Sequence, residues 1–261
     1  MTVTTSSRVN DKLEEKAISV AERYGLQYVP RQNRSLSYLL ENIDQQIFVV
    51  NEARGLSYYE KDKSEAFFHP NMAFLRIKNM ERGERDSLVE VCGLGEGMSC
   101  LDATLGLASD ALTLSYAVGS SGKCTGVEKS RSIYILVKEG LAHYADLNPN
   151  LRDTISRIDI HNGDNLDFMK SCPDKSYDAV YFDFMFESPN AKSHGIHVIR
   201  EHAVGDKMTE RHIDEAVRVA RKSVVVKCDF GGMERLVRCG FEVKKGNSRK
   251  SFYYAGYDLN G

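Results

Sequence analysis

Residues 100–110 read Cys-Leu-Asp-Ala-Thr-Leu-Gly-Leu-Ala-Ser-Asp, and this stretch decides the fold of the chain. A short apolar run ends at Asp102, and three small residues then alternate with larger ones at Thr104, Gly106 and Ala108. An apolar pattern with helical spacing follows directly. The pattern is typical of a parallel strand that turns tightly into a helix and leaves room for a ligand against the main chain. Taken alone, it fits an ordinary tight turn equally well, because only Gly106 is a glycine.

Strand and helix patterns alternate along the chain on both sides of this turn. Candidate strands cover residues 99–102, 123–128, 155–161, 177–184, 224–228, 241–245 and 252–257. Candidate helices cover residues 87–92, 110–118, 130–144, 166–171, 209–220 and 233–239. This alternation predicts an α/β fold with a mostly parallel sheet and helices on both faces. The last two strands are joined only by residues 246–251, too few for a crossover helix, so we expect an antiparallel hairpin there.

The first part of the chain has a different pattern, in which a helix precedes several strands. Asn10 or Asp11 is a suitable helix cap, and the apolar face that follows stops at Gly25. Strand-like segments lie at 46–51, 56–60 and 66–69, before a highly charged segment at 80–86. We therefore predict a small N-terminal α+β subdomain over residues 1–85, a candidate for substrate recognition, and a main domain over residues 86–261.

The composition excludes several classes of protein. Hydrophobic residues make up 42% of the chain, and no apolar stretch approaches the length of a membrane span. Residues 1–8 are polar and lack the apolar centre of a secretory signal. The six cysteines form no Cys-x-x-Cys pair and are interpreted as reduced, buried small residues, so we expect a cytoplasmic protein. A net charge of −2 leaves binding to nucleic acid open.

Acidic and amide side chains end the predicted strands that follow the opening turn. Glu128 stands 22 residues after Gly106, where a carboxylate can accept hydrogen bonds from both hydroxyls of a ribose. The alternative for Glu128 is a surface acid paired with Lys129. Asp164 and Asn165 follow the next strand, and they suit an adenine edge, although Asp164 equally suits the cap of the next helix. The turn and Glu128 together favour a ribose-containing ligand.

The next strand ends in Tyr181-Phe182-Asp183-Phe184-Met185-Phe186. A carboxylate at the end of an apolar strand is expensive to bury unless it is paired or functional, which makes Asp183 a candidate catalytic residue. The aromatic side chains after it suit a flat substrate, although one or two of them equally fit the core. The polar stretch 187–208 favours a substrate loop over a metal site, because its histidines are loosely spaced: His194, His197 and His202.

In these motifs the chain resembles class I S-adenosylmethionine (SAM)-dependent methyltransferases, which have a Rossmann-like fold. Within them it looks like the ribosomal RNA small subunit methyltransferase J family. The resemblance covers roughly residues 73–226 and rests on the motifs at 83–84, 101–111, 127–128, 183–186, 192–193 and 224–227. Three residues depart from the family pattern, since Phe184 and Glu187 stand where the family has prolines and Ser109 where it has arginine.

The resemblance implies SAM as the cofactor and small-subunit rRNA as the partner. It implies methylation of a guanine exocyclic amine. Our hypothesis for this step is that the amine donates its hydrogens to the Asp183 carboxylate, or to the main-chain carbonyl of Asp183 or Phe184, while Phe186 stacks on the base. The turn then forms the wall of the cofactor pocket on the methionine side. The expected cofactor contacts are Asp102, Thr104, Gly106, Ser109, Asp110, Glu128, Lys129, Asp164, Asn165 and Asp183.

Three other functions compete with this one. A SAM-dependent methyltransferase that acts on a small molecule or a protein keeps the fold and the cofactor. A nicotinamide-dependent oxidoreductase uses the same kind of turn, but Asp102 before it and the missing first glycine argue against that class. A relative that binds RNA without turnover is the third. No metal and no membrane contact are expected in any of them.

Overall fold

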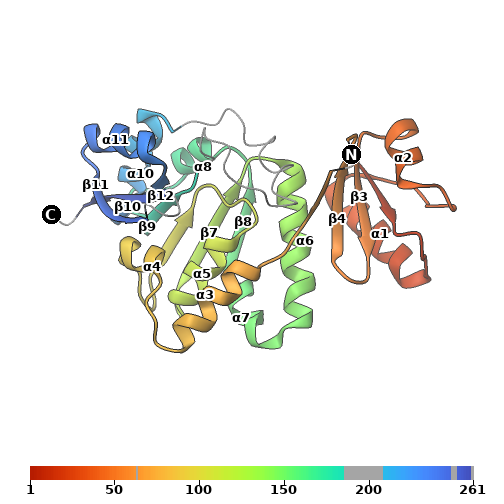
Figure 1. Ribbon diagram of the computed structural model, residues 1–261, viewed down its shortest axis with the longest axis horizontal. Coiled ribbons are helices and arrows are strands. Elements are labelled where there is room, and N and C mark those ends of the chain that lie inside the picture. The colour runs from red at the N-terminus through yellow and green to blue at the C-terminus, as the bar shows by residue number, and fades with distance from the viewer. Residues whose placement is uncertain (63, 185–207, 248–251, 260–261) are drawn as a thin grey trace. The chain divides into compact units, whose positions relative to one another are not determined.

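The computed structural model describes residues 1–62, 64–184, 208–247 and 252–259 (Figure 1). The chain divides into two compact units. Among the described residues, unit 1 comprises 1–69 and 135–147, and unit 2 comprises 70–134, 148–184 and the C-terminal part from 208 onward. Helix α6 (Arg131–Leu147) gives its first turn to unit 2 and the rest to unit 1.

The sheet of unit 2 has seven strands in the order β11-β12-β10-β9-β6-β7-β8. Five of them are parallel, and β12 pairs antiparallel with both β10 and β11. The predicted mostly parallel sheet with an antiparallel C-terminal hairpin is therefore confirmed. The strand bounds are β6 (Ser99–Asp102), β7 (Lys123–Glu128), β8 (Ile158–Asn162), β9 (Tyr177–Phe182), β10 (Ala220–Cys228), β11 (Glu242–Asn247) and β12 (Phe252–Asp258).

Helices cover both faces of this sheet (Figure 1). One face is covered by α8 (Asn165–Ser171), α10 (Glu210–Val219) and α11 (Phe230–Arg238), which share a core with the buried side chains of β6, β9 and β10. The other face carries α4 (Ser87–Cys92), α5 (Ser109–Ala117) and α7 (Arg152–Ser156), and α3 (Asn71–Glu81) packs on α5. A short 3₁₀ turn, η1 (Pro149–Leu151), precedes α7.

Unit 1 contains a five-stranded sheet in the order β2-β1-β3-β4-β5. Its strands are β1 (Thr2–Thr5), β2 (Gln27–Tyr28), β3 (Gln46–Asn51), β4 (Gly55–Glu60) and β5 (Glu65–Phe67), and its helices include α1 (Asp11–Tyr24) and α2 (Leu36–Asn42). Asn10 caps α1 by accepting a hydrogen bond from the Leu13 main-chain N–H, and Gly25 ends it in the left-handed conformation. Both ends of this helix could be predicted from the sequence, because the capping residues Asn10 and Gly25 lie directly next to the helix that they end.

Several element boundaries differ from the sequence prediction. The strand predicted over 155–161 starts only at Ile158, because residues 152–156 form α7. The strand predicted to reach residue 184 ends at Phe182, so Asp183 follows the strand. No strand was predicted over β1, which lies in the polar segment 1–8. All four of its residues are nevertheless buried, and β1 lies between β2 and β3 in the sheet. No helix in the described part of the chain is long and apolar enough to span a membrane.

Candidate active site

The predicted site residues lie where the parallel strands of unit 2 end. Because β6, β7, β8, β9 and β10 run in the same direction, their carboxyl ends meet at one edge of the sheet. Asp102 and Glu128 are the last residues of β6 and β7, and Asp183 comes directly after β9. The topology thus brings together residues that are far apart in the sequence.

The turn after β6 is fixed to both neighbouring strands. The main-chain N–H of Ala103 donates to the Tyr181 carbonyl of β9 over 2.9 Å, and that of Leu105 donates to the Val127 carbonyl of β7 over 2.9 Å. Gly106 and Ala108 have φ angles of 51° and 59°, in the left-handed region that favours glycine. Ala108 precedes α5, and its methyl side chain cannot accept a hydrogen bond. The first main-chain N–H groups of α5 therefore have no side-chain cap from this residue.

Glu128 is held against this turn by main-chain donors. Its Oε2 accepts a hydrogen bond from the Gly106 N–H over 3.0 Å, and its Oε1 accepts one from the Ser130 N–H over 2.8 Å. The two bonds fix the carboxylate between the turn and the end of β7. The sequence placed Gly106 and Glu128 in one site from their spacing, and the structure brings them into direct contact.

Asp164 and Asn165 approach the same turn from β8. Asp164 caps α8, since its Oδ1 accepts hydrogen bonds from the Leu166 and Asp167 N–H groups, and its Oδ2 lies 3.4 Å from Lys129 Nζ. Asn165 Nδ2 donates to the Ala103 carbonyl over 2.9 Å. The helix cap foreseen for Asp164 is therefore present, and Asn165 helps to hold the turn.

Asp183 is held at the end of β9 by two neighbours. Its main-chain N–H donates to Thr104 Oγ1 over 2.6 Å, and its Oδ2 accepts a hydrogen bond from Lys227 Nζ over 2.6 Å. Its side chain is 28% exposed. Burial raises the pKa of Asp183, the charge of Lys227 opposes this, and Asp110 adds to the rise. Lys227 was part of the family motif at 224–227 but was not predicted as a site residue.

Asp110 forms part of a charged network beside the turn. Arg76 of α3 binds Asp86, the cap of α4, through two hydrogen bonds of 2.7 and 2.8 Å, and it also binds Asp110. The Tyr181 hydroxyl donates to Asp110 Oδ2 over 3.0 Å. The structure thus places the Asp110 carboxylate against Arg76 and Tyr181. Arg76 was not among the predicted site residues.

Asp102 is the most deeply buried acid of the site, at 1% exposure. Its Oδ1 accepts a hydrogen bond from the Thr104 N–H over 3.2 Å. Burial raises the pKa of Asp102 well above its usual value, and the nearby carboxylates of Asp110, Asp183 and Glu128 raise it further. The Asp102 side chain therefore lies buried at the turn, where the neighbouring carboxylates disfavour its ionised form.

Some predicted residues fall elsewhere. Phe186, His194, His197 and His202 lie outside the described residues. Phe184 stacks on Phe182 with ring centres 5.4 Å apart and packs against the core shortly after β9. Ser109, the first residue of α5, accepts a hydrogen bond from Thr113 at its carbonyl. Within the residues that the structure describes, no group of His, Cys, Asp or Glu side chains is arranged to hold a metal ion.

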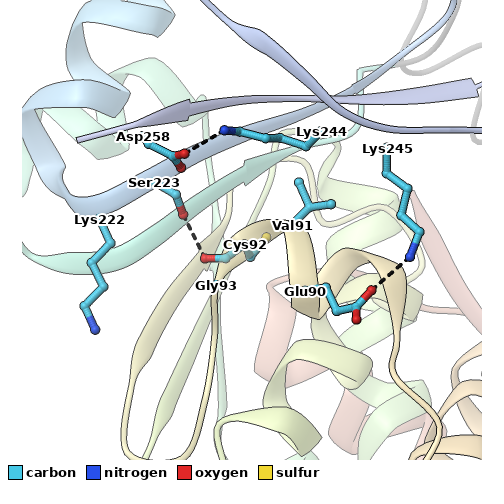
Figure 2. A pocket seen from close by; sticks show the side chains of 9 residues that line it. All are labelled: Glu90, Val91, Cys92, Gly93, Lys222, Ser223, Lys244, Lys245 and Asp258. Carbon is cyan, nitrogen blue, oxygen red and sulfur yellow. Dashed lines mark hydrogen bonds and ion pairs between the residues drawn. The ribbon is translucent and has the colours of Figure 1, made fainter. Parts of the chain in front are cut away.

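A cavity lies apart from these residues, beside the first residues of β10 (Figure 2). It has a volume of about 720 Å³ and is lined by residues of α4, the start of β10 and the hairpin β11–β12. Two of its three lysines pair with acids of the lining, Lys245 with Glu90 at 2.9 Å and Lys244 with Asp258 at 2.6 Å, and Lys222 pairs with Asp178. None of the predicted site residues lines it.

Comparison with known proteins decides the family. A family model described as "Putative SAM-dependent methyltransferase" matches residues 30–234. The chain belongs to this methyltransferase family. A relative in Bacillus subtilis, the uncharacterized protein YpiP, is 38% identical over 243 residues, which are 93% of this chain and 94% of YpiP. Ribosomal RNA small subunit methyltransferase J of Marinobacter nauticus is 31% identical over 133 residues, which are 50% of this chain and 46% of that protein.

A solved structure shows the same fold as this methyltransferase. The SAM-dependent methyltransferase NGO1261 from Neisseria gonorrhoeae aligns with a TM-score of 0.61 at 17% identity, covering 100% of this chain and 97% of that one. The resemblance to class I methyltransferases, drawn from the motifs alone, is therefore confirmed. SAM is the cofactor that this family uses.

The residues at the strand ends of the methyltransferase fit SAM. The cofactor carries positive charge on its sulfonium and ammonium groups. The six carboxylates described above outnumber the three nearby cations, which are Arg76, Lys129 and Lys227. The turn also leaves space, since an added Cβ at Gly106 meets nothing closer than the Thr104 carbonyl at 4.0 Å. A cationic ligand beside this turn relieves the mutual repulsion of the acids.

Proposed function

We propose that this methyltransferase acts on the exocyclic amine of a guanine in small-subunit rRNA. The observation that carries the proposal is the partly exposed Asp183 carboxylate beside the turn, which accepts a hydrogen bond from Lys227 while the Asp183 main-chain N–H donates to Thr104. An ionised carboxylate only accepts hydrogen bonds, which complements an amine with two hydrogens. The partial identity with ribosomal RNA small subunit methyltransferase J supports rRNA as the substrate class.

The chemistry asked of the protein is mainly orientation. SAM, when bound, supplies an activated methyl group on its sulfonium sulfur. The lone pair of the guanine amine is delocalised into the ring, so the amine is a weak nucleophile. A hydrogen bond from this amine to Asp183 turns the nitrogen towards the methyl group and places an acceptor where the amine releases its proton. Phe186 stacks on the base, which leaves any duplex before it reaches the site.

The cofactor contacts belong to the same proposal. Glu128 binds the ribose hydroxyls, because its carboxylate is already oriented towards the turn by two main-chain N–H groups. Lys129, Asp164 and Asn165 border the adenine, and the turn from 102 to 110 borders the methionine part. Unit 1 contributes to recognition of the small ribosomal subunit.

The test is mass spectrometry of rRNA nucleosides from cells with and without the gene. We expect one methylguanosine to be missing from the deletion strain and to return with the wild-type gene. The Asp183→Ala variant should fail to restore it, whereas Asp167→Asn, which changes an exposed acid of α8, should restore it fully. An unchanged nucleoside profile in the deletion strain refutes the proposed substrate.

A second candidate is a methyltransferase for a small molecule or a protein. It is favoured by Phe184, which stands where the methyltransferase J family has proline and packs against Phe182 and His212, so the loop after Asp183 starts differently. Labelled SAM and separated RNA, protein and metabolite fractions of the deletion strain distinguish the two functions. Label in the protein or metabolite fraction alone supports the second. RNA binding without any methyl transfer, with or without cofactor binding, indicates a relative that only binds RNA.

A further inference from the structure

We propose that Lys227 is a positioning residue, which keeps Asp183 an ionised hydrogen-bond acceptor and fixes which of its oxygens faces the substrate. This inference rests on the role that the proposed function gives to Asp183. Val226 of β10 is in register with Phe182, the last residue of β9, so Lys227 of β10 and Asp183, which directly follows β9, stand at the same level. The side chains meet at 2.6 Å between Nζ and Oδ2.

The surroundings of Lys227 favour a fixed ammonium group. Its side chain is 22% exposed, its Nζ lies 5.6 Å from the centre of the Phe252 ring, and Tyr254 stands opposite it on β12. Burial alone lowers the pKa of Lys227, but the charges of Asp183 and Asp110 outweigh this and raise it. The two carboxylates thus favour the charged form of Lys227, although burial opposes it.

The surroundings of Asp183 favour a neutral acid if Lys227 is removed. Burial and the like charge of Asp110 both raise the pKa of Asp183, and only Lys227 is seen to lower it. Thr104 bonds the main chain of Asp183 and leaves its carboxylate untouched. The other titratable groups that interact with this pair are Asp102, Arg76, Tyr181, Tyr254 and Cys228.

The ion pair has a direct consequence for methyl transfer. A protonated Asp183 carries a hydrogen that competes with the amine hydrogens, so it no longer orients the nucleophile. Because Lys227 occupies Oδ2, the substrate meets Oδ1. Lys227 therefore acts through Asp183, without needing to touch the substrate itself.

The first experiment measures the titration of Asp183 without any substrate. In the full-length protein, the ¹³C signal of the Asp183 carboxyl carbon, assigned with Asp183→Asn, is followed against pH. An opposite charge at this distance shifts a carboxyl titration by about 1–3 pH units, so Lys227→Met should raise the midpoint by that amount. Lys227→Arg should keep it near the wild-type midpoint. The control Lys222→Met removes a lysine of the same strand, one that pairs with Asp178, and should leave the midpoint unchanged.

The second experiment measures the pH profile of methyl transfer to rRNA of the deletion strain. The acidic limb of kcat should move to higher pH in Lys227→Met, with activity partly recovered at alkaline pH, and should stay in place in Lys227→Arg. An unmoved carboxyl midpoint or an unmoved limb in folded Lys227→Met overturns the inference. If the wild type transfers nothing to rRNA, the proposed substrate fails, while the carboxyl titration still decides the role of Lys227.

Discussion

Replacing Arg76 by methionine should destabilise unit 2 more than any other single change in the charged network. Its side chain is 20% exposed and bonds Asp86 and Asp110, whose side chains are 10% and 17% exposed. Removing one partner of a buried ion pair costs about 3–5 kcal/mol, because the remaining charge is left unpaired. For a unit of this size, each kcal/mol lowers the melting temperature by about 2–4 °C, so a fall of about 6–20 °C is expected.

The effect should depend on pH in a defined direction. Burial works to raise the pKa of Asp86, but Arg76 and two main-chain N–H groups hold it below 3.8. In the wild type, this carboxylate contributes stability above pH 3.8 and loses it as the pH falls through its lower folded-state pKa. In Arg76→Met, burial dominates and the carboxyl takes up a proton more readily. The deficit relative to wild type should therefore be largest at neutral pH and should shrink near pH 4.

Differential scanning calorimetry of both proteins between pH 4 and 8 measures this. Arg82→Met is the matched control, because Arg82 is exposed at the end of the same helix and its loss should stay within about 0.5 kcal/mol. A second variant, Arg76→Met with Asp110→Asn, should recover part of the loss. A deficit below about 1 kcal/mol, or one that is equal at pH 4 and 7.5, would refute the reasoning.

Three further predictions concern the turn. Glu128→Gln should weaken SAM binding about 10- to 150-fold, the loss of a charge-assisted hydrogen bond, as measured by calorimetric titration; unchanged affinity contradicts the ribose contact. Asp102→Asn should raise the melting temperature at neutral pH, because the raised pKa of Asp102 makes its ionised form increasingly destabilising as pH rises above 3.8; a gain that does not shrink at pH 5 argues against this cause. Gly126→Ala should cost about 1–3 kcal/mol in chemical denaturation, since the new Cβ would lie 2.5 Å from Leu105 Cδ1, whereas Gly163→Ala meets no atom within 4 Å and should not.

The residues at the strand ends could be predicted because the sequence features that mark a strand end lie within a few residues of it. Small residues after an apolar run mark the turn, and a parallel sheet necessarily gathers the ends of its strands at one edge. This is why Gly106, Glu128 and Asp183 could be assigned to one site before their contacts were known. The hairpin at the end of the sheet was likewise fixed by a connection too short to cross over.

The ion pairs could not be predicted, because they depend on the register of distant strands. Lys227 and Asp183 are 44 residues apart, and their level in the sheet depends on an irregularity between Ala220 and Ser223 of β10. Arg76 meets Asp110 only because α3 packs on α5. Such ion pairs depend on how distant elements pack, and the spacing of residues along the sequence does not predict this packing.

The antiparallel hairpin also decides what the sheet of unit 2 shows to other molecules. Its two outermost strands are β11 and β8, and both carry charged side chains: Lys244, Lys245 and Glu242 on β11, and Asp159 on β8. A strand from another chain that added to either edge would have to strip these charges of water and of their partners. The charged residues on β11 and β8 therefore disfavour edge-to-edge aggregation at both ends of the strand order that the structure describes.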